Sequence, residues 1–439
     1  MRGSGVSETA ELTARGGVAA RTRALDLTVY LSFTVFAVIT ALASEFATHR
    51  VWGGYAAVGY GLAAVHVVVL VGYARHRELP RHWFHSRWFS VSVACLFALL
   101  APLAHLVLRR LGGGDWSDNP AAWGAQPEVW VIERSALLLL RDGSPYLDVA
   151  GLDRPPMVDD YTPYGPVMAL FGLPKALVVE LGADNAVALA LTDARIVFAL
   201  VATAGALLAL RLLGRPPVPI GAAQLALVSP ATALTFAVAG PDLAVLGLLL
   251  VAIALAARGN PVMSGIMLAL VVSAKLTAAP AVLVLVILVL VRYGARAAAA
   301  FTAALIAACA TVTVPIIATE PQAFVENVIR FPMGAAEVDS PAASPLPGHL
   351  LASMGPMGHV LALALLGVAA VVITGWLVLR PPATAADAAL RIAVGLGAAT
   401  LLTPATRWGY LVYPLVLLGA WLCFGRQRTP PAQAGPPTA

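Results

Sequence analysis

The sequence predicts an all-α polytopic membrane protein with about twelve transmembrane helices. The chain of 439 residues is 59% hydrophobic and only 12% charged, and its mean hydropathy of +0.83 excludes an ordinary soluble globule. A helix needs roughly 20 mostly apolar residues to cross about 30 Å of hydrocarbon, and many windows of this chain meet that length. The charged residues gather between these windows, and one of the intervening segments is long and acidic.

Length and hydropathy place the expected spans in order along the chain. They lie near residues 26–46, 53–74, 88–109, 189–212, 219–238, 241–257, 262–275, 277–292, 297–318, 358–379, 388–403 and 408–424. Most arginines fall in the loops that this order places in the cytoplasm, so the positive-inside rule predicts a plasma-membrane protein with both termini cytoplasmic. The two largest loops, residues 110–188 and 319–357, then face outward.

The chain ends and the composition narrow the class further. Residues 1–25 are expected to form a cytoplasmic tail without a cleavable signal, 26–428 a membrane domain, and the Pro/Gly/Ala-rich 429–439 a disordered cytoplasmic tail. The net charge of +5 follows from loop arginines, so it does not indicate nucleic-acid binding. Cys95, Cys309 and Cys423 all lie in apolar segments, which argues against a disulfide framework or a thiolate metal site. No His/Asp cluster has convincing metal-ligand spacing, so neither a metal nor another cofactor is expected.

The first outer loop is the most informative segment. Residues 128–140 have apolar positions at approximately helical spacing, and Gly143 to Pro145 should end the helix. We expect an amphipathic helix in the membrane interface. Its polar side would be supplied by Glu133, Arg134 and Arg141, and Trp123, Trp130 and Tyr146 would lie at headgroup depth.

Residues 161–181 follow, apolar but interrupted by prolines. They could span, but a span here would reverse the basic loop at Arg211 and Arg215, so a re-entrant element packed on protein is favoured.

Several short motifs resemble those of the GT-C glycosyltransferases. Residues 128–133 (EVWVIE), 136–140 (ALLLL) and 143–146 (GSPY) are similar to their first outer loop, and 161–166 (YTPYGP) to the Tyr/Pro element that follows. Gly240 to Asp242 resembles a Gly/Asp turn of the class, and residues 264–280, with Lys275 and Pro280, resemble its small-residue helix. The resemblance is closest to glycosyltransferase family 87, which includes actinobacterial polyprenol-phosphate-mannose-dependent mannosyltransferases. It covers residues 128–296 well. Two spans precede this loop that the family pattern lacks, and Glu128 stands where Asp is common.

The resemblance implies a GT-C-like bundle and an enzyme that moves a sugar from a polyprenyl-phosphate donor to an outward-facing lipid or polysaccharide of the cell envelope. Mannose is the first expectation and arabinofuranose the second. They rest on the resemblance and on a composition with only two lysines, Lys175 and Lys275, which suggests a GC-rich bacterial genome. The alternative is a transporter or lipid flippase, favoured by the span count. A pump should carry ionisable groups in the middle of its spans. Apart from Lys275, which lies at a predicted span end, the predicted spans contain almost none, and this argues against a transporter.

Sugar transfer defines the residue types that the site needs. A carboxylate must take the proton of the acceptor hydroxyl, and cationic groups must stabilise the phosphate that leaves. Glu128 is the candidate base, although a carboxylate at a helix start is also commonly structural, and Asp115 and Asp118 are rivals. The predicted substrate-binding residues are Asp118, Asp160, Tyr161, Asp242, Lys275, Arg330, His349 and Arg407.

Each of these residues also has a structural interpretation that the sequence leaves open. Lys275 would bind phosphate or extend to the interface, and Arg407 would clamp phosphate or anchor a span end. Asp242 would serve the site or cap a helix. Asp159 and Asp160 would bind acceptor hydroxyls or form a turn. Arg330 and His349 are donor-site candidates.

Overall fold

The computed structural model describes residues 5–76, 82–112, 123–183, 185–339 and 341–426. Apart from one isolated parallel β-bridge between Ala343 and Thr406, regular structure in these residues is helical. Among them, seven segments are long and apolar enough to cross a membrane, or eight if the bent pair α9 (Ile220–Ala226) and α10 (Pro230–Val238) is one span. Three apolar segments are shorter: α11 (Pro241–Ala257), α12 (Pro261–Ala274) and Trp408–Phe424. The chain is therefore an all-helical multi-pass membrane protein.

The chain forms two compact units, the first made of residues 1–125 and 227–238. Its helices are α1 (Gly5–Ala43), α2 (Ala47–His76), α3 (Arg87–Cys95), the π-helical η2 (Leu96–Leu100), α4 (Ala101–Gly112) and α10. A Cβ atom on Gly53 would lie 2.5 Å from the Ala41 nitrogen, so glycine allows α1 and α2 to approach closely. The Arg87 guanidinium donates to both carboxylate oxygens of the buried Asp26. The helix α1 begins at Gly5, within the segment 1–25 that the sequence predicts as a tail.

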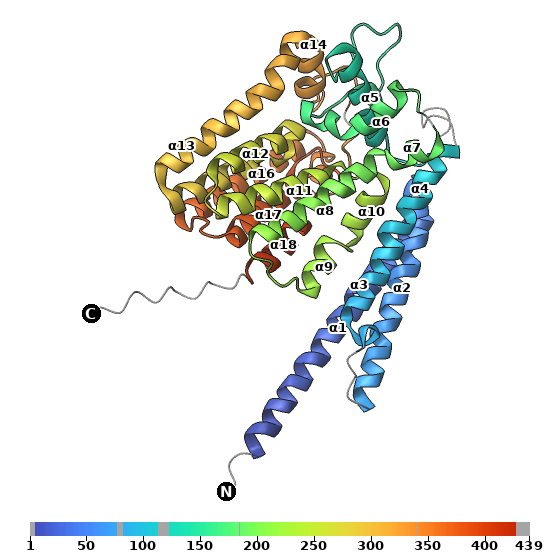
Figure 1. Cartoon of the computed structure of the whole chain (residues 1–439), viewed down its shortest axis with the longest axis vertical. Helices are drawn as coiled ribbons and strands as arrows, with labels where there is room; N and C mark the ends of the chain where they lie inside the picture. The colour runs from blue at the N-terminus through green and yellow to red at the C-terminus, as the bar shows by residue number, and fades with distance from the viewer. Residues whose placement is uncertain (1–4, 77–81, 113–122, 184, 340, 427–439) are drawn as a thin grey trace, which may run out of the picture. The chain divides into compact units, whose positions relative to one another are not determined.

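The second unit, residues 126–226 and 239–439, contains every predicted site residue except Asp118. Figure 1 shows α5 and α6 near one end of its long helices, where α13 runs into α14. In chain order the helices are α5 (Pro127–Asp142), η4 (Val158–Asp160), η5 (Pro166–Gly172), α6 (Leu173–Glu180), α7 (Ala186–Leu191), α8 (Ala194–Leu212), α9, α11, α12, η6 (Leu276–Ala278), α13 (Pro280–Thr319), α14 (Pro321–Phe324), η7 (Val325–Arg330), α15 (Pro347–Ala352), α16 (Pro356–Leu379), α17 (Ala385–Leu402), η8 (Trp408–Leu411) and α18 (Val412–Phe424).

Small residues and prolines explain how these helices pack and where they begin. α11 is the most buried long helix, and it touches α8 where a Cβ on Gly205 would lie 2.4 Å from the Gly247 oxygen. Proline stands at the start of α11, α12, α13 and α16, where its missing N–H costs no helical hydrogen bond. Within α13, Gly294 leaves the helical region at φ 82° and ψ 176°, so the segment is kinked there, between the spans predicted at 277–292 and 297–318.

The helix predicted in the first outer loop is confirmed as α5, which ends at a left-handed Gly143 with φ 75°. One assignment on it was wrong. Glu133 is buried, and its carboxylate accepts a hydrogen bond of 3.0 Å from the Ala194 amide at the start of α8. This follows because the start of α8 covers a side of α5 that its own pattern marks as polar. Tyr146, which follows the helix, is also buried, and its hydroxyl donates to the Tyr164 carbonyl oxygen at 2.9 Å; its depth in a membrane stays a prediction.

Residues 161–181 form the short η5 and α6 and do not include a candidate span. The eight residues of α6 extend only about 12 Å, which is too short to cross a bilayer. The segment is held against α5, since a Cβ on Gly172 would lie 2.5 Å from the Ile132 oxygen. It is therefore packed on protein. Its depth in a membrane stays a prediction.

Candidate functional site

Lys275 stands at a break in the chain between two apolar helices. α12 ends at Ala274, and Lys275 is extended at φ −151° and ψ 117° before the short η6 and Pro280, which begins α13. Proline cannot continue the preceding hydrogen-bond ladder, so the chain changes direction here. Lys275 is buried, so it does not extend to the interface.

A carboxylate neutralises this lysine. The Lys275 Nζ donates to Asp242 Oδ1 at 2.6 Å, and the Tyr413 hydroxyl donates to the same oxygen at 2.7 Å. Both charged side chains are only 9% exposed. Asp242 lies in the first turn of α11 because Gly240, left-handed at φ 90°, and Pro241 start the helix just before it. Burying either charge without the other would destabilise the fold, and in the pair each charge compensates the other.

Two tyrosine rings complete the surroundings of the ammonium group. The Lys275 Nζ lies 4.9 Å from the ring centroid of Tyr410 and 5.6 Å from that of Tyr164. The negative faces of aromatic rings attract a cation at such distances. The pKa of the Tyr164 phenol is raised well above its usual range, by burial and then by the negative charges of Glu128 and Asp242.

A second ion pair joins Glu128 and Arg407, which are 279 residues apart in sequence. Glu128 follows Pro127 at the start of α5, and Arg407 is extended just before η8. The Arg407 Nη1 donates to Glu128 Oε1. Burial alone would lower the pKa of Arg407, but the negative charge of Glu128 raises it above its usual value. The Arg407 side chain is 34% exposed and the Glu128 side chain 20% exposed, so this pair is more accessible than the buried Lys275–Asp242 pair.

The two ion pairs belong to one cluster. Tyr164 is close enough to Glu128, Arg407 and Asp242 for each charge to act on its hydroxyl. Tyr410, whose ring faces Lys275, also acts on the pKa of Arg407. Glu128, Lys275 and Arg407, predicted from three distant segments, are thus brought together by the ends of α5, α12 and η8.

Asp159 adds a further carboxyl group beside Glu128. Burial, and next the negative charge of Glu128, raise the pKa of Asp159 from its usual value to about 6, while Arg134 and Arg407 oppose that rise. Asp160, the adjacent residue, has the opposite character. Burial acts to raise its pKa, but hydrogen bonds from Arg154 and the Met157 amide lower it below its usual value. Asp160 therefore stabilises the turn through Arg154 and the Met157 amide. Asp159 is the residue of the two whose charge interacts with Glu128 and Arg407.

Three further predicted residues make local contacts away from these pairs. The Tyr161 ring is buried and stacks on Phe331, with centroids 4.4 Å apart. Arg330 pairs with Glu326 in its own helical turn and donates to the Ala335 carbonyl oxygen. The His349 Nδ1 lies 2.9 Å from the Pro404 carbonyl oxygen. Asp118 and its rival Asp115 lie outside the described residues.

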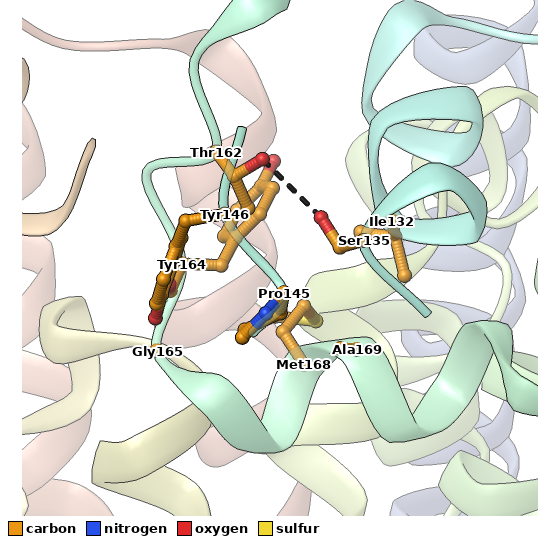
Figure 2. Close-up of a pocket in the computed structure, with 9 residues that line it drawn as sticks. All are labelled: Ile132, Ser135, Pro145, Tyr146, Thr162, Tyr164, Gly165, Met168 and Ala169. Carbon is orange, nitrogen blue, oxygen red and sulfur yellow. Dashed lines mark hydrogen bonds between the residues drawn. The ribbon is translucent and has the colours of Figure 1, made fainter. Parts of the chain in front are cut away.

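A narrow crevice is lined in part by Tyr164 (Figure 2). It is too narrow to admit a water molecule. The Ser135 and Thr162 hydroxyls are 3.2 Å apart on one wall. The other lining residues are Ile132, Pro145, Tyr146, Gly165, Met168 and Ala169. The crevice is mostly apolar, so it belongs to the packing of α5 against the Tyr/Pro segment and η5.

The tyrosines of the cluster were not predicted as site residues, although a signal was present. Arg407, Tyr410 and Tyr413 recur every third residue across η8 and the start of α18, so they share one side of that turn. Tyr164 lies in the Tyr/Pro element but had no assigned role. Within the described part of the chain, no group of three or more His, Cys, Asp or Glu residues is placed to hold a metal ion.

Comparison with known proteins identifies a family. The family model for glycosyltransferase family 87 matches residues 161–404, more than half of the chain, a range that includes Asp242 and Lys275 but ends before Arg407 and starts after Glu128. Searches of the curated proteins and of the solved structures found no match. Matched over this length and built as an all-helical membrane protein, the chain belongs to glycosyltransferase family 87 and is a membrane glycosyltransferase.

Proposed function

We propose that this enzyme transfers a sugar from a polyprenyl-phosphate donor to an outward-facing lipid or polysaccharide acceptor in cell-envelope synthesis. Mannose is the favoured sugar and arabinofuranose the second. The observation that carries the proposal is the pairing of Glu128 with Arg407 beside the pair of Lys275 with Asp242. A carboxylate and two cations lie together in a membrane protein, which suits transfer from a phosphate to a hydroxyl.

The proposed reaction is a direct displacement with inversion at the anomeric carbon. The acceptor hydroxyl oxygen forms the new bond to that carbon, and its proton passes to the Glu128 carboxylate. The bond between the anomeric carbon and the phosphate oxygen breaks, and its electron pair stays on the phosphate. The phosphodiester, which carries one negative charge, leaves as polyprenyl phosphate with two. Lys275 and Arg407 stabilise the additional charge.

Both cations keep donors for a phosphate while remaining in their ion pairs. An ammonium group has three N–H donors and a guanidinium has five. Lys275 uses one to reach Asp242, and Arg407 reaches Glu128 through Nη1. Arg407 is partly exposed, so it would contact the donor first and Lys275 would act at greater depth. Asp159, with its raised pKa, is the reserve candidate for acceptor binding.

We also infer twelve crossings, with the site outside the plasma membrane and both termini in the cytoplasm. The bent pair, the three shorter apolar segments and the division of α13 at Gly294 raise the seven candidate spans to twelve. The site lies where α11 and α18 begin and where α12 ends. The opposite helix ends of this unit carry seven arginines, namely Arg211, Arg215, Arg258, Arg292, Arg296, Arg380 and Arg426. The positive-inside rule puts those ends in the cytoplasm.

The test is transfer by the purified protein. Labelled polyprenyl-phosphate-mannose or polyprenyl-phosphate-arabinofuranose is incubated with the enzyme and a membrane lipid extract, and the labelled product is identified. We expect Glu128→Gln to lower the rate by about 100-fold or more, because the variant loses its base. Glu337→Gln, an exposed carboxylate in the second outer loop, is the matched control and should transfer at the normal rate.

Two outcomes would overturn separate parts of the proposal. Near-normal transfer by Glu128→Gln would remove Glu128 as the base, and Asp118 and Asp159 would be substituted next. Absence of product with both donors, from enzyme that still binds polyprenyl phosphate, would show that another sugar is carried.

A further inference from the structure

The second outer loop holds the segment that carries Arg407. The Ser344 amide donates to the Thr406 carbonyl oxygen at 2.9 Å, and the Thr406 amide donates to the Ala342 carbonyl oxygen at 2.9 Å. The Trp408 amide donates to the Ser344 hydroxyl oxygen at 3.0 Å. These bonds surround the one parallel β-bridge found in the described residues. The backbone is therefore fixed on both sides of Arg407.

A second set of contacts fixes the same segment just before the bridge. The His349 ring lies 2.9 Å from the Pro404 carbonyl oxygen, and a carbonyl only accepts, so Nδ1 carries the hydrogen. A Cβ atom on Gly348 would lie 2.2 Å from the Leu402 oxygen, so the two backbones are in direct contact. Residues 402–408 are thus held at both ends by residues 342–349, although the two segments are distant in sequence.

The extended backbone then directs the arginine. Arg407 has φ −129° and ψ 143°, and neighbouring side chains in extended chain point to opposite sides. Thr406 is buried, and its hydroxyl donates to the Thr400 carbonyl oxygen at 2.8 Å. Arg407 consequently points the other way, toward Glu128.

We propose that residues 342–349 form a positioning element for Arg407, in which Ser344 and His349 act through the backbone of residues 404–408 and do not contact substrate. This inference rests on the proposed function, because it gives Arg407 its role at the donor phosphate. A guanidinium must be held within a fraction of an ångström to stabilise a developing phosphate charge. In this proposal His349 positions the backbone before Arg407, whereas the sequence alone predicts that it binds the donor.

The first experiment measures binding of labelled polyprenyl phosphate to the full-length protein in detergent. Ser344→Ala should weaken binding about fivefold, the effect of one misplaced hydrogen bond, and Arg407→Ala should weaken it at least tenfold. The double variant should bind no more weakly than Arg407→Ala, because Ser344 acts only through that arginine. Ser353→Ala is the matched control. Its hydroxyl bonds to Leu350 within the same loop, and binding should not change.

The second experiment separates positioning by His349 from direct contact. An asparagine amide N–H can replace the Nδ1 hydrogen but cannot reproduce the outer part of the imidazole. His349→Asn should therefore retain donor binding and transfer within about twofold, whereas His349→Ala should lose about fivefold. His359→Ala, an exposed histidine on α16, should leave both quantities unchanged.

Amide hydrogen exchange gives a readout that needs no activity. The amides of Thr406 and Trp408 should exchange faster in Ser344→Ala than in the native protein or in Ser353→Ala. The positioning element is overturned if their exchange does not change, if Ser344→Ala adds a further fivefold loss to Arg407→Ala, or if His349→Asn is as impaired as His349→Ala. Binding of polyprenyl phosphate without transfer of mannose or arabinofuranose would instead contradict the proposed donor sugars and leave the positioning result standing.

Discussion

Replacing Lys275 by methionine tests the buried ion pair and the phosphate role together. The Lys275 Nζ and Asp242 Oδ1 are 2.6 Å apart, and both side chains are 9% exposed. In Lys275→Met the Asp242 carboxylate keeps the hydrogen bond from the Tyr413 hydroxyl, 2.7 Å away, but loses its counter-charge. Leaving a buried charge without its counter-charge typically destabilises a protein by about 3–5 kcal/mol. We expect the single variants Lys275→Met and Asp242→Asn to be destabilised by about this amount.

The double variant should behave differently in stability and in activity. Lys275→Met with Asp242→Asn contains no buried charge, and the asparagine can still accept the Tyr413 hydrogen bond. Its stability should return to within about 1 kcal/mol of the native protein, since a neutral pair of similar volume often replaces a buried ion pair without loss. Sugar transfer should be lost in Lys275→Met and in the double variant, because neither has the Lys275 ammonium group at the donor phosphate.

Thermal unfolding in detergent and the transfer assay measure the two quantities on the same samples. Lys175→Met is the control, because it removes the only other lysine, whose Nζ bonds the Leu189 carbonyl oxygen. It should cost about 1 kcal/mol and leave transfer intact. The reasoning is refuted if the double variant is as unstable as the single ones, or if Lys275→Met transfers sugar normally.

The other predictions concern the loop between α5 and α6. Gly165→Ala places a Cβ atom 2.1 Å from the Ser273 oxygen, so we expect it to lower the unfolding free energy by about 2 kcal/mol or more. Gly367→Ala is the control, because no atom lies within 4 Å of its Cβ, and it should be neutral or slightly stabilising. Burial raises the pKa of Asp159 in the folded protein to about 6, above its value of about 4 in the unfolded chain. The unfolding free energy should therefore decrease as pH rises from about 4 to 6. Denaturation curves collected across that range should show no such decrease for Asp159→Asn. Asp160 has a lowered pKa, so its contribution is present above pH 4 and lost as pH falls below it; Asp160→Asn should cost about 1–2 kcal/mol at pH 7 and have no effect in acid.

Local patterns predicted the long apolar helices and several of the breaks between them. Apolar length predicted the membrane helices, Gly143 ended α5 as expected, and Lys275 stands at the predicted break between two apolar runs. Glycine and proline act on the backbone at their own position, so their effect can be inferred from neighbours in sequence. Glu133 was misplaced because the start of α8, which lies about 60 residues farther along the chain, covers that side of α5.

The sequence by itself determined that this is a helical membrane protein and that it resembles family 87, and it predicted Glu128, Lys275 and Arg407 as candidates for sugar transfer. Only the tertiary structure decided their partners. It paired Lys275 with Asp242, Asp242 with Tyr413 and Glu128 with Arg407, and it joined the residues on both sides of Arg407, Thr406 and Trp408, to the second outer loop. Helix formation depends on residues three or four positions apart, whereas a buried charge is satisfied by whichever group the packing of distant helices brings within 3 Å.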